Sequence, residues 1–401
     1  MTIGFQEAYD YLSARPAAGK EWTLEPTRAL LSLLGNPEQH YASIHIGGSN
    51  GKGSVAAMVA GALARSGLNV ALYTSPHLVD VRERMLVNGR PIPEAAFAQW
   101  TAMLLEEIER NAASFFEATT AIAFADFAAR GADVAVVEVG LGGRLDSTNV
   151  IDPLVSAVTT VSAEHTEYLG DSLQSIAREK AGIAKPGSPF VIGETDQTVV
   201  AVLAEQARTA GADVRVVPQH ATFSGAVGMP GAHQRRNAAV ATAVLDALPG
   251  HLRPSNRDAG AGIAGVKLAG RFDRRGKWLF DVAHNPASFA TLVAGISAAD
   301  LPRPLHALLG ILEDKDHATM LGVLGPVVDS LWLTTPPSAP LHRRSDLAAM
   351  TRLAARAAAV EPDFDLALSG VQRGAATVLV TGSFHTVGDA MSRLPGFPPL
   401  G

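Results

Sequence analysis

A glycine-rich stretch in the first part of the chain has the composition of a phosphate-binding loop. It lies between an apolar run and an alanine-rich stretch that is typical of a helix. Its residues, in order, are Gly47, Gly48, Ser49, Asn50, Gly51, Lys52, Gly53 and Ser54. Glycines allow backbone N–H groups to converge on phosphate oxygens, and the N-terminus of the following helix adds partial positive charge. We therefore predict that this loop binds a nucleotide, with Lys52 at the terminal phosphates and the Ser54 hydroxyl on Mg²⁺.

The position of the hydroxyl departs from the ordinary phosphate loop. In a GTPase or kinase a Ser or Thr follows the lysine directly, whereas here Gly53 follows Lys52 and Ser54 comes one residue later. The plain alternative is a glycine-rich turn between a strand and a helix that binds no ligand. The lysine and the serine together favour the phosphate loop over that alternative.

Short β-branched runs alternate with Ala- and Leu-rich stretches along the chain, which predicts parallel α/β layers. Helices are expected over residues 54–67 and 121–131. The strands expected in the first set of layers are residues 42–48, 69–76, 133–140, 154–162, 188–194 and 213–218. A second set of expected strands lies at residues 278–284, 305–312, 330–337 and 376–383.

A cluster of glycine and arginine separates the two sets of strands, and a domain boundary is expected there. We assign residues 1–270 to an N-terminal P-loop ATPase-type domain with a mostly parallel sheet. Residues 271–401 would form a smaller C-terminal Rossmann-like α/β domain.

Composition excludes several classes of protein. The 401 residues are 47% hydrophobic and 18% charged, so the chain can build packed cores and is not disordered. The formal net charge of −6 argues against nucleic acid as the main partner. There is no Cys, which excludes disulfides, iron–sulfur clusters and thiol nucleophiles. The sequence shows no membrane span and no signal peptide, so we expect a cytoplasmic protein.

Further motifs follow the phosphate loop in a fixed order. They are YTSPHLVDVRERM (73–85), FFEATTAIAF (115–124), VVEVGLGGRLDSTNVI (136–151), EHTEYLG with IAREKAGIAKPG (164–187), HQRRNA (233–238), AGRFD (269–273), DVAHNP (281–286), GILEDKD (310–316) and VTGSFHTVGD (380–389). With GSNGKGS in the loop, this series resembles the folylpolyglutamate synthase/dihydrofolate synthase family of the Mur-ligase superfamily, in its bifunctional bacterial type. The resemblance runs from about residue 22 to about residue 390. No single motif decides it, but the joint order is highly specific.

The resemblance implies two Mg²⁺ ions held by Ser75, Glu138 and His165. Glu138 also ends an apolar strand, the edge at which α/β proteins place ligands. A lone His such as His165 is more often a surface or capping residue, and the family usually has Asp where this chain has Glu164.

The resemblance also implies that Lys180 is carbamylated. Lys180 lies on a short expected helix for which Asp171 and Gln174 suit a capping box and Gly182 a C-cap. The plain alternative for Lys180 is a solvated lysine on an exposed stripe.

By the same resemblance, ATP would be bound by residues 49–54, by Asn237 on its adenine side, and by Arg271 and Asp281. Arg271, Lys52 and Lys180 would act in catalysis, and the plain alternative for Arg271 is an interdomain ion pair. His284 and Ser383 would lie where the incoming amino acid binds, with His284 counted among the catalytic residues. The residues expected to contact the pterin are Phe116, Glu117, Leu145, Asp146 and Ser147.

These parts together predict an ATP-dependent amide ligase that works through an acyl phosphate and adds L-glutamate to dihydropteroate, to folates or to both. Residues 1–270 would bind ATP and the pterin, and residues 271–401 would bind glutamate. We expect a monomer with small-molecule substrates and neither nucleic acid nor membrane as a partner. Two alternatives stay open: another Mur-type amino-acid ligase, and a nucleotide-dependent binding protein without catalysis.

Overall fold

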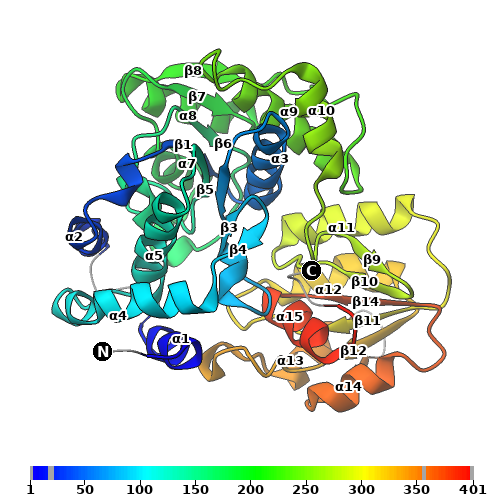
Figure 1. The fold of residues 1–401 in the computed structure, drawn as a ribbon. Helices are drawn as coiled ribbons and strands as arrows, with labels where there is room; N and C mark the ends of the chain where they lie inside the picture. Colours follow the sequence, from blue (N-terminus) through cyan, green and yellow to red (C-terminus); the bar gives the residue numbers. More distant parts are fainter. Residues whose placement is uncertain (1–2, 17–21, 355–357, 398–401) are drawn as a thin grey trace. The chain divides into compact units, whose positions relative to one another are not determined.

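The computed structural model describes residues 3–16, 22–354 and 358–397 and divides into two compact units. The first unit contains the chain up to Pro76, Val81–Gly228 and Gln234–Val266. The second contains the chain from Lys267 onward and two short segments from the first two-thirds of the sequence, His77–Asp80 and Met229–His233. Each unit is built around its own sheet (Figure 1).

The sheet of the first unit has the strand order β4-β3-β2-β5-β1-β6-β7-β8. Its strands are β1 (Ala42–Gly47), β2 (Val70–Tyr73), β3 (Met85–Val87), β4 (Arg90–Pro91), β5 (Val134–Glu138), β6 (Val155–Val158), β7 (Pro189–Ile192) and β8 (Asp213–Val216). Strands β2, β5, β1, β6, β7 and β8 pair in parallel, whereas β3 and β4 extend the β2 edge antiparallel. The centre of the sheet is buried on both faces, which explains why β5 is apolar throughout until its last residue.

Helices flank this sheet on both faces (Figure 1). The helices of the first unit are α1 (Phe5–Ser13), α2 (Glu25–Leu33), α3 (Lys52–Arg65), α4 (Glu94–Arg110), α5 (Phe115–Ala129), α6 (Thr166–Leu169), α7 (Leu173–Ala181), α8 (Gln197–Thr209), α9 (Ala232–Asp246) and α10 (Asn256–Gly265), with short 3₁₀ turns η1 (Pro37–Gln39), η2 (Val81–Arg84) and η3 (Ser147–Val150). Helix α5 is apolar on nearly every side because it lies between the sheet and α2 with α4.

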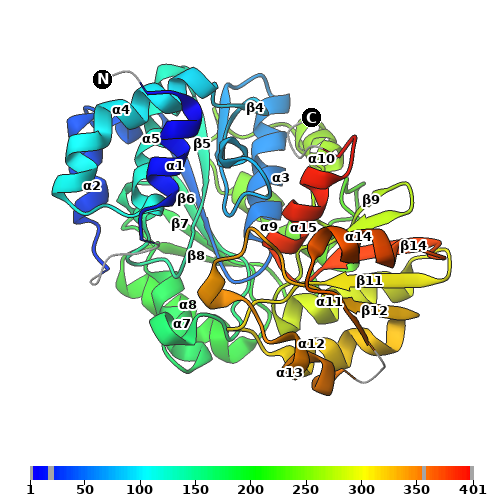
Figure 2. The same cartoon turned by 90° about the horizontal axis from the view of Figure 1, so that it is seen from below.

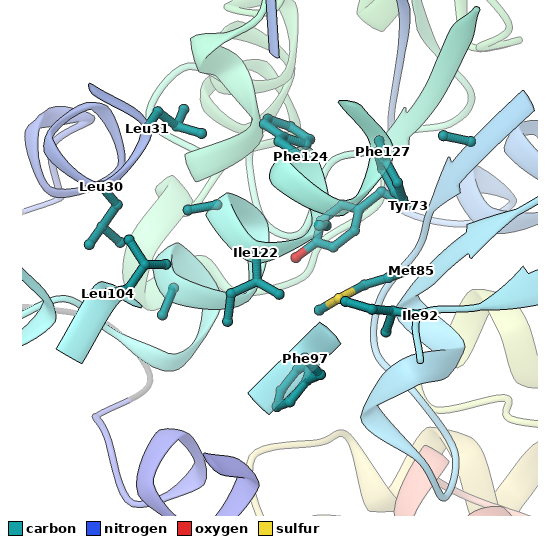
Figure 3. Close-up of a cluster of buried hydrophobic side chains, with 14 of the residues drawn as sticks. Leu30, Leu31, Tyr73, Met85, Ile92, Phe97, Leu104, Ile122, Phe124 and Phe127 are labelled. Atoms are coloured by element: carbon teal, nitrogen blue, oxygen red, sulfur yellow. The ribbon is translucent and has the colours of Figure 1, made fainter. Parts of the chain in front are cut away.

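A large core of the first unit forms around α5. Phe124 of this helix lies edge-on to Tyr73 of β2, with 6.2 Å between the ring centres, and Phe127, Met85 of β3 and Phe97 of α4 belong to the same cluster (Figure 3). The Tyr73 hydroxyl shares a 3.0 Å hydrogen bond with the Thr120 hydroxyl, so its polar end is satisfied inside the core. Burial of each such large side chain contributes about 1.5–3 kcal/mol, and this core fixes the strand ends from which the site loops leave.

The second unit is a smaller three-layer arrangement (Figure 2). Its strand order is β13-β12-β11-β14-β10-β9, parallel except for the edge strand β9. The strands are β9 (Asp273–Arg275), β10 (Trp278–Phe280), β11 (Leu305–Leu309), β12 (Ser330–Leu333), β13 (Ala358–Val360) and β14 (Thr377–Thr381), with short 3₁₀ turns η4 (Gly325–Val327) and η5 (Leu341–Arg343). Helices α11 (Pro286–Ala298), α12 (His317–Leu324) and α13 (Leu347–Leu353) cover one face, and α14 (Phe364–Val371) and α15 (Phe384–Arg393) cover the other.

The predicted α/β class with mostly parallel sheets is confirmed, and a strand lies within each run expected to form one. Some local predictions were wrong. The helix expected over residues 54–67 begins at Lys52, because Gly51 turns the loop straight into its first turn. The capping box of α7 is formed by Ser172 and Ser175 rather than by Asp171 and Gln174. Within the described residues, no helix is both long enough and apolar enough to cross a membrane.

Candidate active site

The phosphate loop connects β1 to α3 and needs its glycines for conformation. Gly48 has φ of 134° and Gly51 has φ of 86°, in the region that side chains with a Cβ rarely adopt. A Cβ at position 48 would also overlap the hydroxyl oxygen of Thr159. The backbone of the loop is therefore specified by sterics before any ligand binds.

The segment that follows β6 holds this loop in place. The Ser49 N–H donates to the Thr160 carbonyl at 2.7 Å, and the Asn50 N–H donates to the Thr160 hydroxyl at 3.0 Å. The Thr159 hydroxyl donates to the Asn50 carbonyl at 2.7 Å, and the Ser162 N–H donates to the Ser49 hydroxyl at 2.9 Å. These residues could not be predicted from the sequence, because nothing local in the sequence links them to the loop.

Replacement of Gly48 by alanine should lower the free energy of unfolding by about 1–3 kcal/mol, the cost of a residue held in an unfavourable backbone region. Gly260→Ala is the matched control. Gly260 lies inside α10, and a Cβ there meets nothing within 4 Å. Alanine should stabilise this helix by about 0.5–1 kcal/mol. Thermal unfolding of the two variants measures the difference, and equal stability would contradict the strain assigned to Gly48.

Lys52 and Ser54 leave the loop in different directions. The Lys52 ammonium donates to the carbonyl oxygens of Gly48 and Ser49 at 3.0 and 3.2 Å. Since an ammonium has three hydrogens, one stays available for a phosphate oxygen. Ser54 is buried, and its hydroxyl accepts a 3.3 Å hydrogen bond from the Gln234 carboxamide on α9. The structure thus gives the Ser54 hydroxyl a protein partner on α9.

Glu138 explains why glycine follows Lys52. Its carboxylate ends β5, is 4% exposed, and accepts a 3.1 Å hydrogen bond from the Ser75 N–H. A Cβ at Gly53 would come within 3.2 Å of Glu138 Oε2 and 3.6 Å of Oε1. The carboxylate therefore occupies the space into which a side chain at position 53 would project.

Lys180 forms a buried ion pair. It is 1% exposed, and its ammonium lies 3.0 Å from the Glu164 carboxylate. Burial acts to raise the pKa of Glu164, but the charges of Lys180 and then Lys52 outweigh it and lower this pKa to about 2. Burial also lowers the pKa of Lys180, although Glu164 opposes that shift. The interpretation of Lys180 as an exposed, solvated lysine was wrong.

The residues expected to bind metal do not form a ready-made cage of acidic and imidazole groups. Over residues 3–16, 22–354 and 358–397, no three His, Asp or Glu side chains gather in a way that could hold an ion. His165 precedes α6 with φ of 48°, directly after Glu164. A set of one hydroxyl, one carboxylate and one imidazole suits Mg²⁺ when phosphate oxygens and water complete the coordination. The residues present fit an ion that binds together with a nucleotide.

Asn237 lies against the phosphate loop. It is buried on α9, and its side-chain N–H donates to the Gln234 carboxamide oxygen at 3.0 Å. A Cβ at Gly51 would lie 2.7 Å from the Asn237 carboxamide oxygen. The structure thereby brings the expected base-side residue and the expected phosphate loop together.

The residues expected at the pterin gather around the glycine-rich turn after β5. Phe116 packs so closely over Gly140 that a Cβ there would overlap its ring. Asp146 begins η3 and accepts hydrogen bonds from the N–H groups of Leu141 at 2.8 Å and Thr148 at 3.0 Å, and burial raises its pKa. Leu145 is half-buried and Ser147 is buried in the same turn.

Glu117 has a structural task near that turn. Its carboxylate accepts a 2.6 Å hydrogen bond from the Ser114 N–H and completes the capping box of α5. A contact with the pterin would have to share this carboxylate with the helix cap.

In the second unit, Arg271 and His284 both lie against the Phe384 ring. The guanidinium carbon of Arg271 lies 5.0 Å from the centre of the Phe384 ring, and the His284 ring lies 5.6 Å from it. Asp281 accepts 2.9 Å hydrogen bonds from the N–H groups of Phe272 and Ala283. Burial raises the pKa of Asp281 to about 6, against the opposing charge of Arg271.

Ser383 is engaged within its own helix end. It is buried, its hydroxyl donates to the Gly310 carbonyl at 2.8 Å, and it accepts from the Thr386 N–H at 3.1 Å. These contacts use its hydrogen and cap α15, so the geometry offers no direct support for the expected contact with an amino acid.

The chain is similar to known proteins over both units. The Mur ligase middle domain matches residues 46–223, and the Mur ligase glutamate ligase domain matches residues 270–384. The folylpolyglutamate synthase of Lacticaseibacillus casei is 33% identical over 372 residues, which cover 84% of this chain and 87% of that protein. The chain belongs to the folylpolyglutamate synthase/dihydrofolate synthase family. The dihydrofolate synthase/folylpolyglutamate synthase of Escherichia coli K12 is 34% identical, with 86% of this chain and 85% of the relative covered.

Other members of the family differ in length. The chain spans 40% of a Haloferax volcanii relative, a probable bifunctional folylpolyglutamate synthase/dihydropteroate synthase, with which it shares 40% identity. It spans 44% of the corresponding relative from Halobacterium salinarum. The chain thus covers less than half of these two proteins.

Solved structures of the family share the whole fold. E. coli FolC in complex with DHPP and ADP superposes with a TM-score of 0.86 at 30% identity, covering 97% of each chain. A bifunctional folylpolyglutamate synthase/dihydrofolate synthase with Mn, AMPPNP and L-glutamate bound gives a TM-score of 0.82 at 29% identity, covering 98% of each chain.

Proposed function

We propose that the protein is an ATP-dependent ligase that joins L-glutamate to dihydropteroate and to folates through an amide bond. The phosphate loop packed beside the Glu138 carboxylate carries this proposal, because it supplies a nucleotide site with an adjacent anionic group for a divalent ion. The family relationship supplies the substrate class. Relatives with the same fold bind ADP, DHPP, an ATP analogue with Mn, and L-glutamate.

The reaction needs ATP because a carboxylate has only oxide as a leaving group. An oxygen of the acceptor carboxylate bonds to the γ-phosphorus of ATP, and the bond from that phosphorus to ADP breaks. The amine of glutamate then attacks the acyl carbon, a C–N bond forms, and inorganic phosphate leaves while the nitrogen loses a proton. Lys52 would stabilise the negative charge on the transferred group, and the backbone of the loop would position it. The resemblance to the family implies the same task for Arg271.

Ser75, Glu138 and His165 would hold the divalent ions, for which we propose two Mg²⁺ sites. Bound Mg²⁺ supplies charge stabilisation at the phosphate oxygens. We further propose that Lys180 carries a carbamate, which would give its nitrogen two anionic oxygens, and the burial that disfavours its ammonium supports this.

The acceptor would bind at the glycine-rich turn with Phe116, Leu145, Asp146 and Ser147, and Glu117 beside them. Glutamate would bind in the second unit near His284, with Ser383 in a supporting position. That the protein is cytoplasmic and monomeric stays a prediction.

An assay of ADP release with each acceptor offered separately tests the function. We expect release only when L-glutamate is present together with dihydropteroate or tetrahydrofolate. Another Mur-type ligase would release ADP with neither folate acceptor, and a binding protein would bind ADP without turnover. Either result would overturn the proposal.

The affinity for ATP should fall as the pH drops through about 6, the pKa of Asp281. Below this pH the carboxyl gains a proton and loses its charge, and binding should weaken by up to about tenfold per pH unit. Phosphate groups also titrate near pH 6, so the informative quantity is the ratio of affinities between wild type and Asp281→Asn. This ratio should decline toward one at low pH, and a constant ratio would contradict the role of Asp281.

The same pKa has a consequence for stability. Because it is raised on folding, the stability associated with this group is fully present below the unfolded pKa of 3.8 and is lost as the pH rises through about 6.

A further inference from the structure

A buried series of hydrogen-bonded polar side chains connects α3, the helix that follows the phosphate loop, to α9. Gln234 is 2% exposed, and both ends of its carboxamide are bonded. Its N–H donates to the Ser54 hydroxyl at 3.3 Å, and its carbonyl oxygen accepts from Asn237 at 3.0 Å. Gln234 and Asn237 are three residues apart on α9, so they lie on one face of the helix.

This series of side chains ends at the phosphate loop, where Asn237 lies beside Gly51. The carboxamide oxygen of Asn237 lies beside Gly51, where an added Cβ would come within 2.7 Å of it. Ser54 belongs to the first turn of α3, directly after the loop. Gln234 is therefore bonded to two groups that both belong to the surroundings of the nucleotide.

We propose that Gln234 is a positioning residue of the nucleotide site. Its hydrogen bond to Ser54 anchors Gln234, and Gln234 in turn holds Asn237 against the phosphate loop. This rests on the proposed use of ATP. It also gives a reason for the late hydroxyl of the loop, since Ser54 acts as an anchor for α9 and not as a ligand of Mg²⁺. A buried carboxamide with both ends bonded holds its neighbours in one orientation, because any rotation leaves polar groups unpaired.

Gln234→Met tests this directly, because methionine has a similar shape and cannot form either hydrogen bond. Calorimetric titration of the full chain with ADP and with GDP, in the absence of Mg²⁺, gives the two dissociation constants. We expect the wild type to prefer ADP. In Gln234→Met the Kd for ADP should rise about tenfold, as expected for loss of a buried hydrogen-bond pair, and the preference for ADP over GDP should shrink.

Val244→Ala is the matched control. Val244 is buried further along α9 and has an apolar side chain. Its truncation should lower the melting temperature through a cavity while the Kd for ADP changes by no more than about twofold. A general loosening of α9 would affect both variants alike.

Ser54→Ala distinguishes a role of Ser54 as an anchor for α9 from a role as a ligand of Mg²⁺. The same variant tests the proposal if Gln234→Met does not fold. As an anchor, Ser54→Ala should weaken ADP binding and reduce the preference for ADP without Mg²⁺. As a metal ligand, it would change binding only when Mg²⁺ is present.

The inference is overturned if Gln234→Met and Ser54→Ala keep both the affinity and the preference of the wild type, or if the wild type binds ADP and GDP equally. A wild type that binds no ADP would instead contradict the proposed function, and this inference with it.

Discussion

Lys52→Ala should lower kcat for glutamate-dependent ADP release by roughly 10²–10³-fold, the loss typical of one preorganised group that stabilises transition-state charge. Its ammonium lies on the Gly48 and Ser49 carbonyls of the loop, with a hydrogen left for phosphate. The fold should persist, because Lys52 is only half-buried at the start of α3. Steady-state kinetics with a parallel melting curve measure both quantities.

Lys267→Ala is the control for loss of a lysine charge, since Lys267 is exposed. It should leave kcat unchanged. An unaltered kcat in Lys52→Ala with a normal melting curve would contradict the assignment of the phosphate loop.

Lys180→Ala should lose roughly 10²–10³-fold in kcat if a carbamate on this residue supplies charge at the site. The carbamate forms when the neutral amine bonds to the carbon of CO₂ and loses a proton, so activity should depend on bicarbonate. Acetate or formate should restore part of the activity to Lys180→Ala, because their oxygens can replace those of the carbamate. Acetate or formate should not restore activity to Lys180→Arg, since a guanidinium stays charged and fills the space.

The competing explanation is that Lys180 stays unmodified and acts through its ion pair with Glu164. Removal of Lys180 leaves the Glu164 carboxylate buried without the ammonium that pairs with it, which costs about 3–5 kcal/mol of stability. The double variant Lys180→Met with Glu164→Gln removes both charges and should recover stability. It should stay inactive if the carbamate is needed. High activity in Lys180→Arg, or in the double variant, would contradict the carbamate.

The layers and the phosphate loop could be predicted because their signals are local. A run such as 133–140 is apolar on both faces of a central strand, and glycines at positions 48 and 51 mark a backbone that only they adopt easily. The short antiparallel strands β3, β4 and β9 are two or three residues long, too short to show a period.

The support of the site could not be predicted because it depends on contacts between distant segments. Thr159 and Thr160 reach the loop across more than a hundred residues, and Gln234 reaches Ser54 across 180. The assignment of His77–Asp80 to the second unit likewise depends on packing. The burial of Lys180 was missed because a lysine is usually exposed, although Ile176 and Ala177, one turn before it on α7, are buried on the same face of the helix.

Transfer of a labelled oxygen tests the central claim most directly. An acceptor whose carboxylate carries a heavy oxygen isotope is incubated with the protein, ATP, Mg²⁺ and L-glutamate, and the phosphate released is analysed by mass spectrometry. An acyl phosphate places one carboxylate oxygen in inorganic phosphate as the amide forms, so we expect one labelled oxygen per phosphate released with product. Amide formation with unlabelled phosphate, or with the label in AMP, would contradict the account.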